Sequence, residues 1–253
     1  MESVFRLEGK TALITGASRG IGKAIAEGLA KQGAFCILTS RKIEDLESVV
    51  KQIRSNGGKA KAVACNIGDM SQINDLVTVL KKEITKLDIL VNNAATNPYF
   101  GPMSGINPGQ WEKTVDVNLK GPFFLIQKTI SLLEDSGSAS IINVGSVNGV
   151  RPSLMQGVYS ITKAALFSMT QGFAKELAQK KIRVNALLPG LTQTNFSKAL
   201  TDNEDLLKDV CATIPLGRQA QPEEMAGAVL YLGSDASSYT TGTCIVCDGG
   251  LLA

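Results

Sequence analysis

Three side chains with complementary proton chemistry stand close together in the sequence, at Ser146, Tyr159 and Lys163. Tyr159 and Lys163 have the i, i+4 spacing that places both side chains on one face of a helix. Ser146 follows a strand-like run at 140–145, and open α/β sheets bind their ligands at the carboxyl ends of strands. A phenol, an ammonium and a hydroxyl that converge there can move a proton to or from a carbonyl oxygen.

The positive charge of Lys163 is expected to favour ionised tyrosine and to lower the pKa of Tyr159 from its ordinary value of about 10. Tyr-x-x-x-Lys also arises by chance on amphipathic helices, so this spacing alone does not identify a catalytic pair, and other parts of the chain must support it. The 253 residues include no histidine. This absence excludes Ser-His-Asp and Cys-His catalysis and histidine metal ligands, and it leaves Tyr, Lys, Cys or a carboxylate as the general acid. We expect no metal.

Composition narrows the class of protein further. The net charge is +3 and the charges are interspersed, so we expect no nucleic-acid partner. No apolar run approaches the roughly 18 residues of a membrane span, and we expect no membrane partner. The first ten residues are charged and too short for a signal peptide. The five scattered cysteines fit reduced thiols, which predicts a cytoplasmic protein.

Cys244 and Cys247 form a C-x-x-C pattern inside a strand-like run. Positions i and i+3 of a strand face opposite sides of the sheet, so we interpret them as small apolar residues. A redox pair is the alternative.

A glycine-rich turn lies between an expected strand at 10–16 and an expected helix at 23–32. Strand, glycine turn and helix form the context of a dinucleotide-binding fingerprint, in which the backbone approaches a pyrophosphate at a helix amino terminus. A plain tight turn is the alternative interpretation. The candidate cofactor residues in this turn are Gly16, Ser18, Arg19, Gly20, Ile21 and Gly22.

The second expected strand, 34–39, ends at Ser40 and Arg41. NAD-binding folds usually have a carboxylate near this position, which accepts from the ribose 2′-hydroxyl. Here Arg41 stands at the strand end and Arg19 adds a second cation, an arrangement that suits a 2′-phosphate. We therefore expect NADP(H), with NAD(H) the less favoured cofactor. The alternative is a solvated Arg-Lys pair that opens the next helix.

Strand-like and helix-like runs alternate along the whole chain, which predicts one α/β domain, 1–253, with a parallel sheet and helices on both faces. The expected strands are 10–16, 34–39, 59–65, 87–91, 138–145, 182–187 and 242–246. The expected helices are 23–32, 43–56, 69–86, 108–133, 159–178 and 221–232. Residues 191–216 show no clean strand.

With these pieces placed, the chain resembles the "classical" division of the short-chain dehydrogenase/reductase family over essentially its whole length. The matching motifs are Thr15 to Gly22, Asn92 to Ala95, Asn118, Ser146, Tyr159 with Lys163, and Pro189-Gly190 with Thr194. Each motif alone is weak, but six in the right order and spacing are specific. The resemblance implies a Rossmann-like, doubly wound domain of about seven parallel strands.

The resemblance also implies reversible hydride transfer between a nicotinamide and a small-molecule carbonyl or secondary alcohol. Tyr159 would be the acid/base, Lys163 would assist it and hold the nicotinamide ribose, and Ser146 would bind the substrate oxygen. Asn118 would position a water that links Lys163 to solvent. The implied further cofactor contacts are Asn66, Ile67, Asn93, Ala94, Pro189, Gly190, Thr192 and Thr194.

Three functions stay open from the sequence. The leading one is an NADP(H)-dependent carbonyl reductase. The second is a 3-oxoacyl-[acyl-carrier-protein] reductase, for which Lys198 and Arg218 are the candidate carrier-binding cations. The third is a non-catalytic cofactor-binding module.

Apolar residues spread around the helices of 111–133 and 159–178, so a second face of each helix must be buried. Together with the resemblance, this predicts a homotetramer. Pro122 has no N–H for the carbonyl of Asn118, which predicts a bend at residues 118–121 and a water on that carbonyl.

Overall fold

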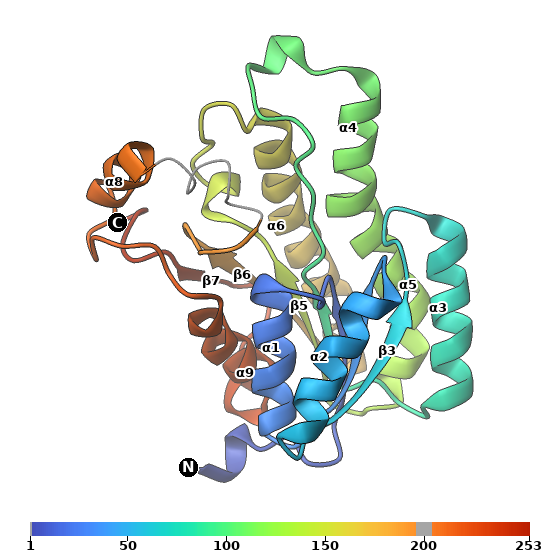
Figure 1. Cartoon of the computed structure of the whole chain (residues 1–253). Coiled ribbons are helices and arrows are strands. Elements are labelled where there is room, and N and C mark those ends of the chain that lie inside the picture. Colours follow the sequence, from blue (N-terminus) through green and yellow to red (C-terminus); the bar gives the residue numbers. More distant parts are fainter. Residues whose placement is uncertain (1, 196–203) are drawn as a thin grey trace.

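The computed structural model describes residues 2–195 and 204–253, and Lys198 lies outside them. Its centre is a seven-stranded parallel sheet of order β3-β2-β1-β4-β5-β6-β7 (Figure 1). The strands are β1 Thr11–Thr15, β2 Phe35–Ser40, β3 Lys59–Ala64, β4 Ile89–Asn92, β5 Ala139–Val144, β6 Ile182–Pro189 and β7 Cys244–Cys247. Every strand predicted from the sequence is present, and the predicted α/β class is confirmed.

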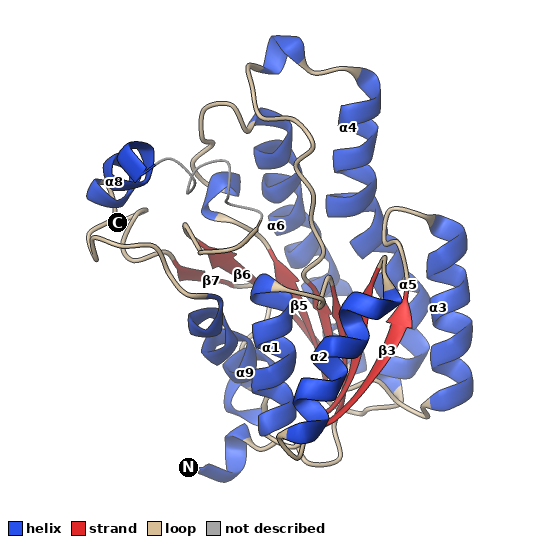
Figure 2. Ribbon diagram, in the orientation of Figure 1, coloured by secondary structure: helices blue, strands red, loops and turns tan. Residues whose placement is uncertain are grey.

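Helices cover both faces of this sheet (Figure 2). The α-helices are α1 Gly20–Lys31, α2 Ile43–Ser55, α3 Met70–Glu83, α4 Pro108–Val115, α5 Gly121–Glu134, α6 Gly157–Leu177, α8 Glu204–Ala212 and α9 Ala226–Gly233. One apolar core joins α1, α2 and α9 to the sheet, and a second core joins α3, α5 and α6 to it. The central strands β1, β2 and β4 are almost entirely buried and consist mostly of apolar residues, because both of their faces are covered.

The strand order reverses between β1 and β4, the two neighbours at the centre of the sheet. In open α/β sheets a ligand binds outside the carboxyl ends of the strands at such a reversal. The predicted glycine turn follows β1 here, and Asn92 and Asn93 lie at the end of β4 and at the start of the loop after it.

The long helix expected over 108–133 is interrupted in the region where Pro122 predicted a bend. A π-helical stretch, Asp116–Lys120, separates α4 from α5, and the N–H of Gly121 donates to the carbonyl of Asp116. The wider helical turn removes the demand for an i to i−4 bond where proline has no donor. The water predicted on the Asn118 carbonyl stays a prediction.

Two features differ from the sequence expectations. Helix α8, Glu204–Ala212, lies in the stretch 191–216 that showed only mixed polar and apolar residues. The helix expected from 221 begins instead with a 3₁₀ turn, Pro222–Met225, before α9. Among the described residues, no helix is long and apolar enough to cross a membrane. Cys244 and Cys247 are free thiols.

Candidate active site

The glycine turn forms a close-packed cradle between β1 and α1. Gly16 and Gly20 have φ angles of +65° and +55°, a backbone conformation that side chains rarely adopt. A Cβ on Gly22 would lie 2.4 Å from the carbonyl oxygen of Gly16 and 2.4 Å from Nδ2 of Asn93. The turn can therefore pack this closely against itself and Asn93 only because these positions carry no side chain.

Asn93 ties this cradle to the end of β4. Its Nδ2 donates to the carbonyl oxygens of Thr15 at 2.9 Å and Gly16 at 3.1 Å. The hydroxyl of Thr15 accepts from the backbone N–H groups of Asn93 and Ala94, each at 3.0 Å. The two loops at the strand-order reversal are thus fixed to each other by side-chain bonds.

Ser40 and Arg41 lie beside the cradle at the carboxyl end of β2, where they line the same cavity as Arg19. Arg41 is exposed, and no carboxylate lines this cavity among the described residues. A phosphate on the adenosine ribose would meet two guanidinium groups here, and the residues present fit NADP(H).

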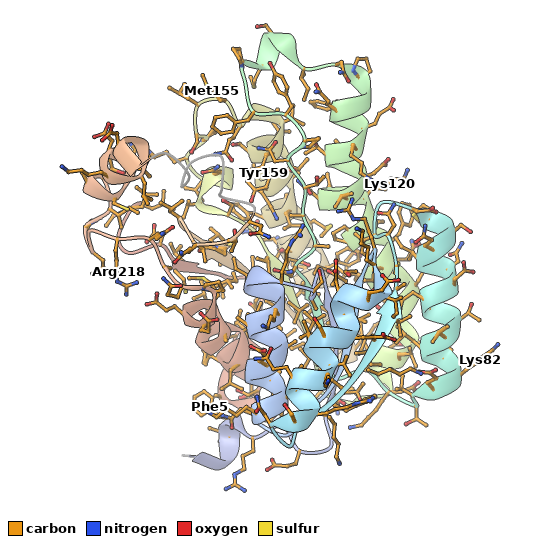
Figure 3. All side chains as sticks on the ribbon, in the orientation of Figure 1. Phe5, Lys82, Lys120, Met155, Tyr159 and Arg218 are labelled. Carbon is orange, nitrogen blue, oxygen red and sulfur yellow. The ribbon has the colours of Figure 1, made fainter. Side chains whose placement is uncertain are left out.

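Ser146, Tyr159 and Lys163 converge at the far end of that cavity, as the sequence predicted. Ser146 follows β5, and its side chain forms a hydrogen bond with the Tyr159 phenol. Nζ of Lys163 donates to the carbonyl of Val144 at 2.6 Å and lies 5.6 Å from the centre of the Tyr159 ring. Tyr159 is buried, and Figure 3 shows it at α6, away from the outline of the molecule.

Burial controls the ionisation of both titratable groups. It raises the pKa of Tyr159 to about 12, and the Ser146 hydrogen bond lowers that pKa by a smaller amount. Burial lowers the pKa of Lys163 to about 7. The sequence expectation of a lowered tyrosine pKa is therefore wrong for this structure, because the desolvation of phenolate outweighs the other effects.

Asn118 does not line the cavity, unlike the other predicted site residues. Its Nδ2 donates to the carbonyl of Thr96 at 2.9 Å and to the hydroxyl of Thr162 at 3.2 Å, and its Oδ1 accepts from the Thr96 N–H at 2.8 Å. The side chain thus fastens the loop after β4 to α6. The π-helical stretch sets the direction in which this buried amide points.

The remaining predicted cofactor residues surround the cradle. Thr194 packs against Gly20, since a Cβ there would lie 3.2 Å from its methyl group. Thr192 pairs with Ala220 in an isolated parallel bridge, and its hydroxyl donates to the carbonyl of Gly190 at 3.1 Å. Asn66 accepts from the Gly68 N–H at 3.2 Å.

A single cavity of about 600 Å³ runs through this region. Its lining includes these predicted residues: Gly16, Ser18, Arg19, Gly20, Ile21, Gly22, Ser40, Arg41, Asn66, Ile67, Asn93, Ala94, Ser146, Tyr159, Lys163, Pro189, Gly190, Thr192 and Thr194.

The sequence reasoning missed a polar group in the same cavity, formed by Asn148, Ser153 and Gln156. Gln156 has the i, i+3 spacing to Tyr159 that places two residues on one helix face, which was the available signal. Asn148 and Ser153 lie in the loop between β5 and α6, where no periodicity marks the residues that face a ligand.

Comparison with known proteins agrees with this geometry. The family described as "Enoyl-(Acyl carrier protein) reductase" matches residues 16–252. Human "Dehydrogenase/reductase SDR family member 4" is 36% identical over 244 residues, which are 96% of this chain and 88% of the relative. The chain is a classical short-chain dehydrogenase/reductase. Members of this family are NAD(P)-dependent oxidoreductases that act on CH–OH groups, and so is this protein.

Two further relatives differ in the substrates that their names state. The "3-oxoacyl-[acyl-carrier-protein] reductase FabG" of Thermotoga maritima is 39% identical over 247 residues, 98% of this chain and 99% of the relative. A crystal structure of a gluconate 5-dehydrogenase from Burkholderia cenocepacia J2315, in complex with NADP and tartrate, superposes with a TM-score of 0.95 at 32% identity. That match covers 99% of this chain and 98% of the other. The family is shared, whereas the substrate differs among its members.

Proposed function

We propose that this protein is an NADP(H)-dependent carbonyl reductase whose acid/base is Tyr159. The observation that carries the proposal is one cavity with the glycine cradle at one end and the Tyr159 phenol at the other. Bound NADPH supplies a hydride to the carbonyl carbon. The carbonyl oxygen takes a proton from Tyr159, so a ketone, NADPH and one proton give a secondary alcohol and NADP⁺.

The side chains at the reacting end divide the work. With its pKa at about 12, Tyr159 stays a phenol at neutral pH, the form needed to donate a proton during reduction. The Ser146 hydroxyl, already bonded to Tyr159, can hold the substrate oxygen on which negative charge develops. The bond to the Val144 carbonyl holds Lys163 beneath the phenol ring. We assign to Lys163 the role of binding the ribose of the nicotinamide.

We assign Asn118 a positioning role. Its bonds to Thr96 and Thr162 hold the loop after β4 against the helix that carries Tyr159 and Lys163. The proton relay through a water on its carbonyl remains part of this proposal, supported by the π-helical stretch at that residue.

The 3-oxoacyl-[acyl-carrier-protein] reductase is the second candidate, favoured by the Thermotoga maritima relative. A carrier protein is acidic and would need free cations at the cavity rim. Arg218, however, donates through both terminal nitrogens to Glu224, each bond 2.8 Å long. It also lies at the outer edge of the molecule, away from Tyr159 (Figure 3). We therefore favour a free small-molecule carbonyl. Family membership removes the non-catalytic module from consideration.

A panel of ketones, β-ketoesters and acyl thioesters tests this proposal by NADPH oxidation at 340 nm. We expect turnover of free ketones or ketoesters, and faster reaction with NADPH than with NADH. Turnover restricted to carrier-bound 3-oxoacyl groups would establish the second candidate. No turnover of any carbonyl, with cofactor bound, would overturn both.

We also propose a homotetramer. Trp111, Phe123 and Ile161 are exposed at 43%, 40% and 46% on α4, α5 and α6, and Phe123 continues a ring cluster with Phe124 and Phe173. A second copy of the chain would cover these side chains at a two-fold axis. Light scattering at micromolar concentration tests the assembly, and a monomer would contradict it.

The five free thiols further support a cytoplasmic, reducing compartment.

A further inference from the structure

A chain of hydrogen bonds extends from Ser146 away from the cofactor cradle. The Ser146 hydroxyl accepts from the Asn148 N–H at 3.1 Å. Nδ2 of Asn148 donates to Oε1 of Gln156 at 3.2 Å, and Oδ1 of Asn148 accepts from the Ser153 hydroxyl at 2.8 Å. All four residues line the cavity. This polar group, Asn148, Ser153 and Gln156, continues the reacting end beyond Ser146.

The bonds around Gln156 leave one of its groups available. Its Oε1 is taken by Asn148, and its backbone carbonyl accepts from the N–H and hydroxyl of Ser160 at 2.9 and 2.8 Å. An amide nitrogen carries two donors. Within the described part of the chain, Nε2 of Gln156 has no hydrogen-bond acceptor. Among the described residues, nothing therefore competes with a ligand in the cavity for the two donors of this amide.

The location of Gln156, close to the reacting side chains, indicates that a ligand bound to its amide would be the substrate. Gln156 is the residue before α6 begins, and it lines the same cavity as Tyr159. Ser146 is bonded to Tyr159 on one side and to Asn148 on the other. A carbonyl held by Ser146 and Tyr159 would thus have its neighbouring atoms beside the Gln156 amide.

Four basic side chains line the cavity among the described residues. Arg19 and Arg41 belong to the cradle, Lys113 interacts with Asp69 at the start of α3, and Nζ of Lys163 donates to the carbonyl of Val144. Among the described residues, the cavity-lining side chains joined to Gln156 by hydrogen bonds, Asn148 and through it Ser153, are uncharged. A carboxylate would lack a cationic partner there, whereas a neutral oxygen needs only an N–H donor.

We propose that Gln156 is a specificity-determining residue that donates from Nε2 to a second, neutral oxygen of the substrate. The substrate class is a ketone with a carbonyl one or two carbons from the reacting one, as in a diketone or a β-ketoester. This inference rests on the proposed reductase activity and deepens it. Asn148 is the positioning residue that turns the Gln156 amide.

The test compares a matched pair of substrates, diacetyl and butanone, which differ by one oxygen. We expect Gln156→Met, which keeps the length of the side chain but removes the donor, to lower kcat/KM for diacetyl about ten-fold. The value for butanone should change less than about two-fold, because butanone has no second oxygen to lose. Leu154→Ala, in the same loop and 92% exposed, is the control and should change neither value.

Gln156→Glu provides a second variant if Gln156→Met folds poorly, as judged by circular dichroism and NADPH affinity. Its carboxylate can still accept from Asn148 but presents only an acceptor to diacetyl, so the ratio of the two kcat/KM values should fall by more than ten-fold. Equal losses for both substrates would show a merely structural role and overturn the proposal. Turnover of both ketones by the wild type without an effect on the ratio would also overturn it while leaving the reductase activity intact. No turnover of any ketone would overturn the activity itself, and the proposal with it.

Discussion

Nζ of Lys163 lies 5.6 Å from the centre of the Tyr159 ring, and its hydrogen bond goes to the carbonyl of Val144. The side-chain nitrogen of Lys163 therefore lies beneath the phenol in a site from which the surrounding protein excludes most water, since Lys163 is 2% exposed. Each group is held in its neutral form by this burial, the tyrosine up to about pH 12 and the lysine above about pH 7. The pair has consequences for stability as well as for proton transfer.

The first prediction concerns the pH dependence of the cofactor-free protein. The pKa of Lys163 is about 7 when folded and near its ordinary value of 10.5 when unfolded, so between these values the unfolded state binds the additional proton. The unfolding free energy should then rise with pH over that window, by up to about 1.4 kcal/mol per pH unit from this group. Lys163→Met should remove this rise.

Urea denaturation at several pH values between 6 and 10 measures the effect as the difference between wild type and Lys163→Met. The matched control is Lys175→Met, an exposed lysine on the same helix. A Lys163→Met curve parallel to that of the wild type across the window would contradict the buried, neutral lysine.

The second prediction concerns the general acid. Tyr159→Phe removes the hydroxyl while keeping the buried ring, so the fold and cofactor affinity should persist and kcat for ketone reduction should fall about 10² to 10⁴-fold. Steady-state kinetics and NADPH titration by fluorescence measure the two effects. Tyr239→Phe, at a fully exposed tyrosine, should leave both unchanged. Near-normal turnover by Tyr159→Phe would rule out its assignment.

Cofactor preference gives the third prediction. If Arg41 binds the 2′-phosphate, Arg41→Ala should weaken NADPH binding by about ten-fold or more, the value of a charge-assisted hydrogen bond, and leave NADH almost unaffected. Isothermal titration with both cofactors checks this. Lys51→Ala makes the same change of net charge on the exposed side of α2 and should affect neither cofactor. Equal weakening of NADPH and NADH would refute the role of Arg41.

The fourth prediction concerns the cradle. Gly22→Ala places a methyl group 2.4 Å from the Gly16 carbonyl and from Asn93, so the turn must shift. We expect a loss of about 1–3 kcal/mol in stability and at least a ten-fold loss in affinity for either cofactor. Gly109→Ala is the control, since its Cβ would make only an ordinary contact at 3.5 Å on an exposed helix. Unchanged cofactor binding in Gly22→Ala would mean that the backbone does not approach the ligand there.

The sequence predicted the parts of this site that depend on short spacing. The Tyr159–Lys163 interval, the glycine turn and the break at Pro122 each follow from local geometry, and the structure contains all three. The pKa of Tyr159 was predicted in the wrong direction because the sequence identifies a neighbouring charge but not the depth of burial. That depth is a property of the assembled cavity.

The residues at the substrate end of the cavity could not be predicted from the sequence for a similar reason. Asn148 and Gln156 meet through a side-chain bond across a loop, and nothing in the order of the residues states which amide faces the cavity. Helix α8 was missed although Leu207, Val210 and Cys211 have the i, i+3, i+4 spacing of a helix face, because its nine residues are too short a segment for that pattern to be decisive.

The bonds from Asn93 to the carbonyls of Thr15 and Gly16 join residues 78 and 77 positions apart. During folding, the βαβ unit formed by β1, α1 and β2 can assemble early from nearby residues. Its glycine turn, however, receives the hydrogen bonds from Asn93 only when β4 inserts beside β1. Loop closure of that length is a slow step that local propensity cannot replace. We therefore expect a nicotinamide cofactor, which needs the completed turn, to leave the folding rate unchanged. It should instead lower the unfolding rate by stabilising the sheet with β4 in place, which prolongs the lifetime of the folded enzyme.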